Sequence, residues 1–203
     1  MAARVTPRAI ESERAARIVA AMRLSVARRG VAGSTFDHVA REAQVSRGLL
    51  HYHFGTKERL LAEVARHEAA ARVAVLRERL ADAANADELI EVLLDSLRAT
   101  IRDDPEFLTV MFELFALARR HPEIATEVEA LLSSTRGEVA GVLADLHASG
   151  AISLPASAEV VAEAIFAIGD GAALRALAEP GRDAAPLLAL LGSVARTLLD
   201  DRV

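Results

Sequence analysis

Apolar side chains recur every three or four positions along most of this 203-residue chain, which is the spacing of amphipathic α-helices. The first run begins at Glu11, places Ile18, Met22 and Val26 on one face, and ends at Gly30, a residue suited to the position after a helix. The alternation typical of strands is hard to find. We therefore predict an all-α protein with about nine helices, the later ones covering roughly 35–43, 46–54, 56–84, 87–104, 106–119, 122–149, 157–178 and 184–199.

Composition supports this prediction. Aromatic residues are only 3% of the chain and there is no Trp, so the core must be built largely from Ala, Leu, Val and Ile, of which Ala and Leu are strong helix formers. The absence of Cys excludes disulfides and thiolate metal sites and fits a reducing compartment. The N-terminal region contains no apolar run of signal-peptide length, and no segment approaches the 18 uninterrupted apolar residues of a membrane span. These features favour a cytoplasmic protein with no membrane partner.

Charge divides the chain unequally. Residues 1–60 carry 11 basic and 5 acidic side chains, a net charge of +6, whereas residues 61–203 carry 13 and 24, a net charge of −11. A basic first third on an acidic remainder suggests a module that faces nucleic acid, although ordinary surface variation explains it equally well.

Residues 34–60, STFDHVAREAQVSRGLLHYHFGTKERL, contain the most informative motif. They predict two short helices, capped by Thr35 and Ser46, with a tight turn at Gln44 between them. The turn needs a residue with positive φ, usually Gly, so Gln44 implies modest strain. Ala40 provides the small side chain that the helix crossing needs. This arrangement is a helix-turn-helix, whose second helix enters the DNA major groove.

The second helix of this motif carries side chains suited to DNA. Arg47 can reach guanine O6 and N7 or a phosphate, Gly48 allows close approach, and Lys57 adds charge beside a helix N-terminus. His51 and His53 diverge by roughly 200° around a helix, so we predict no metal site there, and no cofactor. The predicted DNA-binding residues are Thr35, Ser46, Arg47, Gly48, His51, Tyr52, His53, Thr56 and Lys57.

Residues 11–60 resemble the DNA-binding domain of the TetR family of bacterial transcriptional regulators. The resemblance rests on Gly30, Thr35, Val39-Ala40, Val45-Ser46, Gly48-Leu49-Leu50, His53-Phe54, Lys57-Glu58 and Leu60-Leu61. Three residues depart from the family pattern. Gln44 replaces the usual turn Gly, His51 stands where Tyr is usual, and Asp37 stands where a basic or neutral residue often meets phosphate.

The resemblance implies three parts: a flexible basic arm at 1–10, a DNA-binding domain at 11–56, and a helical ligand-binding and dimerisation domain at 57–203, which resembles the BetI-like group more weakly. It also implies that the last two helices pair with their copies in a homodimer, although burial within one chain would give the same apolar rows. The predicted dimer residues are Val161, Ile165, Ile168, Leu187, Leu191, Val194 and Leu198.

Aromatic residues outside the motif cluster in the sixth and eighth predicted helices, and apolar pockets between helices are common ligand sites. The predicted pocket residues are Phe107, Met111, Phe112, Phe115, His147, Phe166 and Asp170, with Glu113 as a further polar candidate. The family resemblance implies a repressor that a small-molecule effector releases from a palindromic operator. The alternatives are a dimeric DNA-binding protein without a ligand response and, more distantly, a helical-bundle enzyme. No catalytic motif is present, so we expect no enzyme activity.

Overall fold

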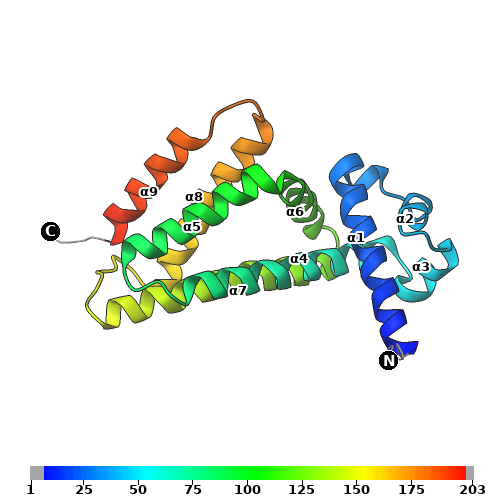
Figure 1. The fold of residues 1–203 in the computed structure, drawn as a ribbon, viewed down its shortest axis with the longest axis horizontal. Coiled ribbons are helices and arrows are strands. Elements are labelled where there is room, and N and C mark those ends of the chain that lie inside the picture. Colours follow the sequence, from blue (N-terminus) through cyan, green and yellow to red (C-terminus); the bar gives the residue numbers. More distant parts are fainter. Residues whose placement is uncertain (1–6, 200–203) are drawn as a thin grey trace, which may run out of the picture. The chain divides into compact units, whose positions relative to one another are not determined.

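The computed structural model describes residues 7–199, and within that range it contains nine α-helices, as predicted (Figure 1). Residues 1–6 of the expected basic arm lie outside the described range, and residues 7–10 already belong to the first helix. The helices are α1 Pro7–Gly33, α2 Phe36–Glu42, α3 Arg47–Phe54, α4 Lys57–Leu80, α5 Ala86–Asp103, α6 Pro105–Ala118, α7 Pro122–Ala148, α8 Ala158–Ala178 and α9 Ala185–Leu199.

Local side-chain chemistry sets several of these helix boundaries. The hydroxyls of Thr35 and Ser46 accept hydrogen bonds from the backbone N–H groups three residues later, at 3.3 Å in both cases, and the Thr56 hydroxyl does the same at 3.2 Å. Pro105 occupies the first position of α6, where its missing N–H costs nothing. These three caps and the Pro105 position were predicted from the sequence, and they are confirmed.

Two predicted boundaries were wrong. The first helix begins at Pro7, four residues before the predicted Glu11, because a proline at the first helical position is compatible with the helix. The fourth helix ends at Leu80 and not near Ala84, because Asn85 caps the next helix and the chain must turn before it. None of the helices in the described part of the chain is long and apolar enough to cross a membrane.

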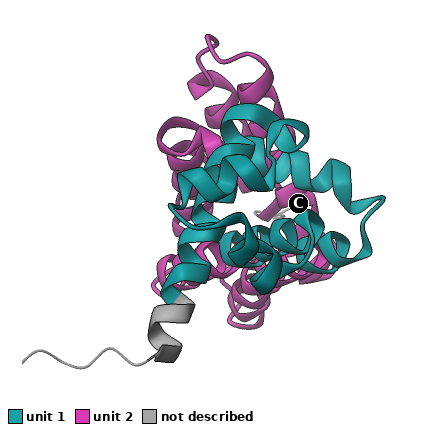
Figure 2. Ribbon diagram, turned by 90° about the vertical axis from the view of Figure 1, so that its right-hand side faces the viewer, with its two compact units in different colours: residues 1–68, 109–128 teal, residues 69–108, 129–203 magenta. Residues whose placement is uncertain are grey.

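The chain divides into two compact units (Figure 2). Unit 1 comprises residues 1–68 and 109–128, and unit 2 comprises residues 69–108 and 129–203. The division falls within α4, α6 and α7. Unit 1 thus contains the helix-turn-helix together with a segment of α6 and α7 that follows it by more than 40 positions.

The interior of each unit is apolar. In unit 1, α1 contacts α2 and α2 contacts α3. The buried side chains of these helices and of early α4 include Ile18, Met22, Val26, Val39, Leu50, Leu60, Leu61 and Val64. In unit 2, α5 contacts α8 and α9, and α8 contacts α9. A cluster that includes Leu80, Leu89, Ile90, Leu143, Ala162 and Leu199 forms its core. Arg196 on α9 also binds Asp87 and Glu91 on α5, at 2.6 and 2.8 Å.

Candidate nucleic-acid interface

A buried frame fixes the orientation of α3. Val39 and Ala40 on α2 and Leu50 on α3 are buried, so the two short helices are held against each other by apolar contact. Between them, Gln44 has φ of 55°, and the N–H of Val45 donates to the carbonyl of Ala40 at 3.0 Å. The positive φ that we predicted at Gln44 is confirmed, and in residues 7–199 no other non-glycine residue has one. The turn between α2 and α3 therefore contains backbone strain at Gln44.

The opposite side of α3 is exposed. Arg47, Gly48, His51 and Tyr52 face solvent, and the Tyr52 side chain is 76% exposed. A Cβ added at Gly48 would meet no atom of the chain nearer than the Ser46 hydroxyl, at 3.9 Å. Packing within the chain therefore does not require glycine at that position. This surface carries hydrogen-bond donors at the N-terminal end of α3, where helices of this motif meet base edges.

A chain of polar contacts fixes the Arg47 side chain. Its Nη1 donates to both carboxylate oxygens of Asp37, at 3.3 and 3.4 Å, and its Nε donates to Nε2 of His51 at 3.4 Å. The Nδ1 of His51 lies 3.2 Å from the carbonyl oxygen of Gly55, and the His51 ring meets the ring of Phe36 edge to face, with centroids 4.8 Å apart. Two of the three departures from the family pattern, Asp37 and His51, therefore both hold Arg47.

Lys57 lies in a different environment. Its half-buried ammonium group donates a hydrogen bond to the carbonyl oxygen of Val31, at the end of α1, and burial lowers the pKa of Lys57, while Glu58 and Glu113 raise it. The N–H of Val31 donates to Oε2 of Glu113 at 3.2 Å. Beside it, Gly30 has φ of 66° and ψ of 171°. The backbone N–H of Val31 is thus bound by Glu113 of α6, and its carbonyl oxygen by Lys57 of α4.

The position of Glu113 was not foreseen from the sequence. Glu113 is a polar candidate for the predicted ligand pocket, but its carboxylate accepts a hydrogen bond from the Val31 N–H at the end of α1, within unit 1. The sequence does contain a hint of this contact. Glu113 and Thr109 are the polar residues between Phe107 and Ala118 of α6, and the rest of that stretch is apolar. Such a side chain must find a polar partner when its helix packs.

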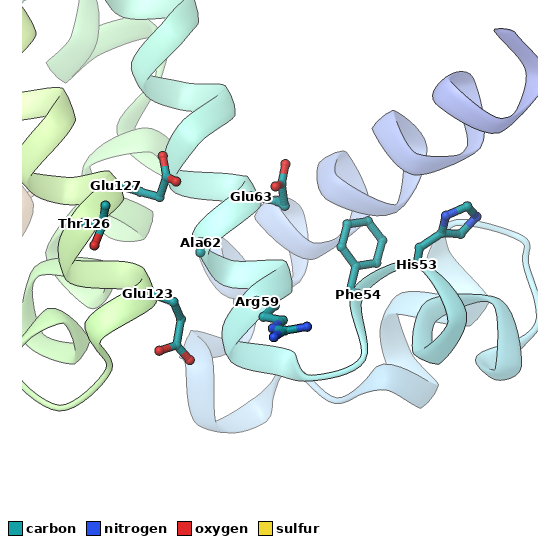
Figure 3. Close-up of a pocket in the computed structure, with 8 residues that line it drawn as sticks. All are labelled: His53, Phe54, Arg59, Ala62, Glu63, Glu123, Thr126 and Glu127. Carbon is teal, nitrogen blue, oxygen red and sulfur yellow. The ribbon is translucent and has the colours of Figure 1, made fainter. Parts of the chain in front are cut away.

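His53 lies beside an open pocket of about 350 Å³ in unit 1 (Figure 3). The His53 side chain is half-buried, and its ring meets that of Tyr52 edge to face with centroids 5.2 Å apart. Three carboxylates and one guanidinium group are among the groups around the pocket. Its lining residues are His53, Phe54, Arg59, Ala62, Glu63, Glu123, Thr126 and Glu127. None of the predicted ligand-pocket residues lines it.

The predicted ligand-pocket residues are divided between the two units. In unit 1, Met111 is buried, and the rings of Phe112 and Phe115 meet edge to face at 5.9 Å. In unit 2, the Arg72 guanidinium group lies over the Phe107 ring, with its central carbon 3.9 Å from the ring centroid. Phe166 packs against the core of the same unit.

The two polar residues of that set lie at exposed positions of unit 2. His147 lies in the last turn of α7, and its Nδ1 is 3.3 Å from the carbonyl oxygen of Ile152, which follows that helix. Asp170 lies on α8, where desolvation by the surrounding protein raises the pKa of its carboxyl group even though part of the residue remains accessible. The ligand pocket stays a prediction.

The predicted dimer residues also differ in exposure. Val161 is 4% exposed and belongs to the core of unit 2, and Ile165, Leu191 and Leu198 are half-buried. The exposed large apolar side chains of the last two helices are Val160, Ile168 and Leu174 on α8 and Leu187, Leu190 and Val194 on α9. Val160, Leu174 and Leu190 are not among the predicted dimer residues, and their exposure depends on which faces of α8 and α9 the other helices cover.

Comparison with known proteins agrees with this geometry. A family model described as bacterial regulatory proteins, tetR family, matches residues 18–64, and one described as the C-terminal region of BetI-type transcriptional repressors matches residues 86–200, more than half of the chain. The protein is thus a DNA-binding transcriptional regulator. The chain belongs to the TetR family, whose members are regulators and not enzymes.

Individual relatives are more distant. The HTH-type transcriptional regulator PksA of Bacillus subtilis is 27% identical over 161 residues, covering 76% of this chain and 74% of PksA. A transcriptional regulator from Saccharomonospora viridis, solved in complex with choline, has a TM-score of 0.82 at 20% identity and covers 94% of this chain and 100% of its own. FadR of Bacillus subtilis, solved in complex with stearoyl-CoA, has a TM-score of 0.75 at 19% identity and covers 89% and 96%. The two structural likenesses establish the fold.

Proposed function

We propose that this regulator is a homodimeric repressor that binds a palindromic operator in double-stranded DNA and leaves it when a small molecule binds. The observation that carries the proposal is the exposed polar face of α3, with Arg47 at its start, on a buried apolar frame. Arg47 reads a base edge, while Tyr52 and the hydroxyls of Thr35 and Thr56 contact the DNA backbone. One of the two remaining N–H groups of Lys57 contacts a phosphate.

Dimerisation rests on the exposed apolar side chains of α8 and α9. Six of them lie on two helices that contact each other, and Leu190 is 61% exposed. Exposed apolar side chains that gather on neighbouring helices favour an interaction site. Two copies related by a two-fold axis would bury these side chains in a four-helix arrangement, which also matches the symmetry of a palindromic operator.

The dimer has a direct test. We expect Leu190→Arg to produce a monomer in sedimentation experiments and to reduce operator affinity, because an arginine at the centre of the interface would be buried without a partner. Val75→Arg is the matched control, since Val75 is a similarly exposed apolar residue on α4. A Leu190→Arg variant that remains dimeric at the same concentration would exclude α9 from the interface.

Ligand release is supported by relatives and by unit 1 itself. The BetI-type match covers a repressor's C-terminal region, and two proteins of the same fold were solved with choline and with stearoyl-CoA. Within unit 1, Glu113 of α6 and Lys57 of α4 both bind Val31 at the end of α1. A ligand that displaces α6 would therefore also displace α1, which contacts α2, and α2 in turn contacts α3. Such a ligand must bind the released state more tightly than the DNA-bound state.

The experiment begins with selection of genomic DNA fragments by the purified protein, which gives the operator and its neighbouring genes. Apolar and cationic metabolites are then screened for compounds that raise the melting temperature and also release the selected fragment. We expect at least one compound to do both. If every stabilising compound leaves DNA binding unchanged, the protein is a dimeric DNA-binding regulator without a ligand response.

A further inference from the structure

We propose that Asp37 is a specificity-determining residue: with His51 it holds the Arg47 guanidinium group in the orientation that reads guanine, although Asp37 itself need touch no base. The inference rests on the proposed role of Arg47 in base reading. Asp37 lies in the first turn of α2, ten positions before Arg47. Helices α2 and α3 contact each other (Figure 1), and this contact brings the two side chains within hydrogen-bond distance.

The contacts restrain Arg47 from two sides. The carboxylate of Asp37 binds Nη1, at 3.3 and 3.4 Å, while Nε2 of His51 accepts from Nε at 3.4 Å. The two partners are held differently. The backbone of Asp37 follows the buried Phe36 while its side chain is 62% exposed, and the His51 ring meets the Phe36 ring edge to face and lies 3.2 Å from the Gly55 carbonyl. Arg47 is thus tied to α2, to the next turn of α3, and through His51 to the residue that ends α3.

The hydrogen positions of this network follow from its acceptors. A carbonyl oxygen can only accept, so Nδ1 of His51 must donate to Gly55. In the neutral ring Nε2 is then an acceptor, which is what Nε–H of Arg47 requires. One Nη1 N–H can serve both carboxylate oxygens of Asp37. The guanidinium group therefore keeps N–H groups on the adjacent Nη1 and Nη2 atoms, the pair that meets O6 and N7 of guanine.

Stability does not explain why a carboxylate should lie here. The side chains of Arg47 and Asp37 are 60% and 62% exposed, and ion pairs as exposed as this contribute little to the free energy of unfolding. A negative charge on the surface that faces DNA also weakens attraction to phosphates. The ion pair instead restrains the long Arg47 side chain before DNA binds. This restraint lowers the conformational entropy that Arg47 loses when it contacts a base. The expected gain is in discrimination between sequences.

The test uses the full-length protein and DNA selected from a random library by the wild-type chain. Affinity is measured at fixed salt for the selected site, for the same site with its guanine replaced, and for an unrelated duplex. We expect Asp37→Asn to bind the unrelated duplex more tightly and to lower the ratio of selected-site to replaced-site affinity by about three- to tenfold. Its melting temperature should match that of the wild type.

Glu42→Gln is the matched control. Glu42 is another carboxylate of α2, but it pairs with Arg28 at 3.7 Å and not with Arg47. Its neutralisation should raise affinity for all three duplexes by a similar factor and leave the ratio unchanged. In an Arg47→Ala background, Asp37→Asn should no longer change the ratio, because the two residues act as one unit.

The outcomes separate this inference from the proposed function. An Asp37→Asn variant that keeps the wild-type ratio, or one that raises it by freeing Arg47 from a restraint that opposes reading, would overturn the inference even if Arg47→Ala relaxes specificity. Failure of the wild-type chain to select any sequence would instead contradict the proposed function.

Discussion

Two basic side chains of unit 1, Arg47 and Lys57, were predicted from the sequence to contact DNA, yet they lie in opposite environments. Arg47 is at an exposed position, and its partners Asp37 and His51 are exposed as well. Lys57 is half-buried, and its ammonium group binds a backbone carbonyl that closes the end of α1. Charge and position in the motif are therefore not enough to assign a role to a basic side chain, because burial decides whether its cation is available to a partner outside the chain.

The different exposure of Arg47 and Lys57 also predicts which variants change DNA binding and which change the free energy of unfolding. Removing an exposed side chain costs the fold little, whereas removing the Lys57 ammonium group takes one of two hydrogen bonds from the half-buried Val31 carbonyl, leaving the one from the Ser34 N–H at 3.1 Å. Variants at Arg47 should therefore change DNA binding alone, and variants around Val31 should change the free energy of unfolding.

The largest effect is expected from Arg47→Ala. Loss of a bidentate contact to a base should weaken binding to the selected site by about 1–3 kcal/mol, or roughly 5- to 150-fold, and relax base preference. The free energy of unfolding, measured by urea titration, should be unchanged. Arg47→Lys is the control that keeps the charge, and it should recover non-specific binding without recovering selectivity. Unchanged affinity and selectivity in Arg47→Ala at fixed salt would contradict the assignment.

Gly30→Ala should destabilise the chain by about 1–3 kcal/mol, because the φ and ψ of Gly30 fall in a region that is essentially restricted to glycine. The new Cβ would also stand 3.1 Å from Oε1 of Glu113. Gly137→Ala on α7 provides the opposite control. Gly137 is helical with open space around it, so alanine there should stabilise by up to about 1 kcal/mol. Equal effects of the two variants in urea titration would show that the conformation of Gly30 is not required.

Lys57→Met tests both roles of this side chain. Loss of the hydrogen bond to Val31 should lower the free energy of unfolding by about 1 kcal/mol, since the carbonyl is only partly buried. Loss of a phosphate contact should reduce the slope of log affinity against log salt by about one. A wild-type slope would remove Lys57 from the phosphate contacts, and wild-type stability would remove its role at the end of α1.

The smallest effect is expected at the turn. Gln44→Gly removes the strain of a positive φ at a non-glycine residue, which should stabilise the folded state by about 1–2 kcal/mol. Glycine also raises the conformational entropy of the unfolded chain, which should destabilise the fold by about 0.4–1 kcal/mol. The net result should be a stabilisation of about 0.5 kcal/mol in urea titration, with operator affinity unchanged. Destabilisation would mean that the Gln44 side chain makes a contribution that outweighs its backbone strain.

Sequence reasoning succeeded where the cause is local. A helix cap needs only its own hydroxyl and an N–H three residues later, so Thr35, Ser46 and Thr56 could be recognised directly. It did not reach contacts between distant segments. The Asp37–Arg47 pair requires the angle between α2 and α3, and the Glu113–Val31 contact joins residues 82 positions apart. The predicted domain boundary at residue 57 remains a prediction, although part of α6 and α7 clusters with the DNA-binding helices.

The all-α class, the positions of the three caps and the two helices of the helix-turn-helix could be predicted from the sequence, because periodicity and capping act over a few residues. Tertiary structure alone decided that Arg47 is exposed and restrained while Lys57 is half-buried, and that Val160, Leu174 and Leu190 stay exposed while Val161 does not. The physical reason is that an amphipathic helix specifies which face is apolar, but packing against other helices decides how much of that face, and which of the charges at its edge, remain accessible.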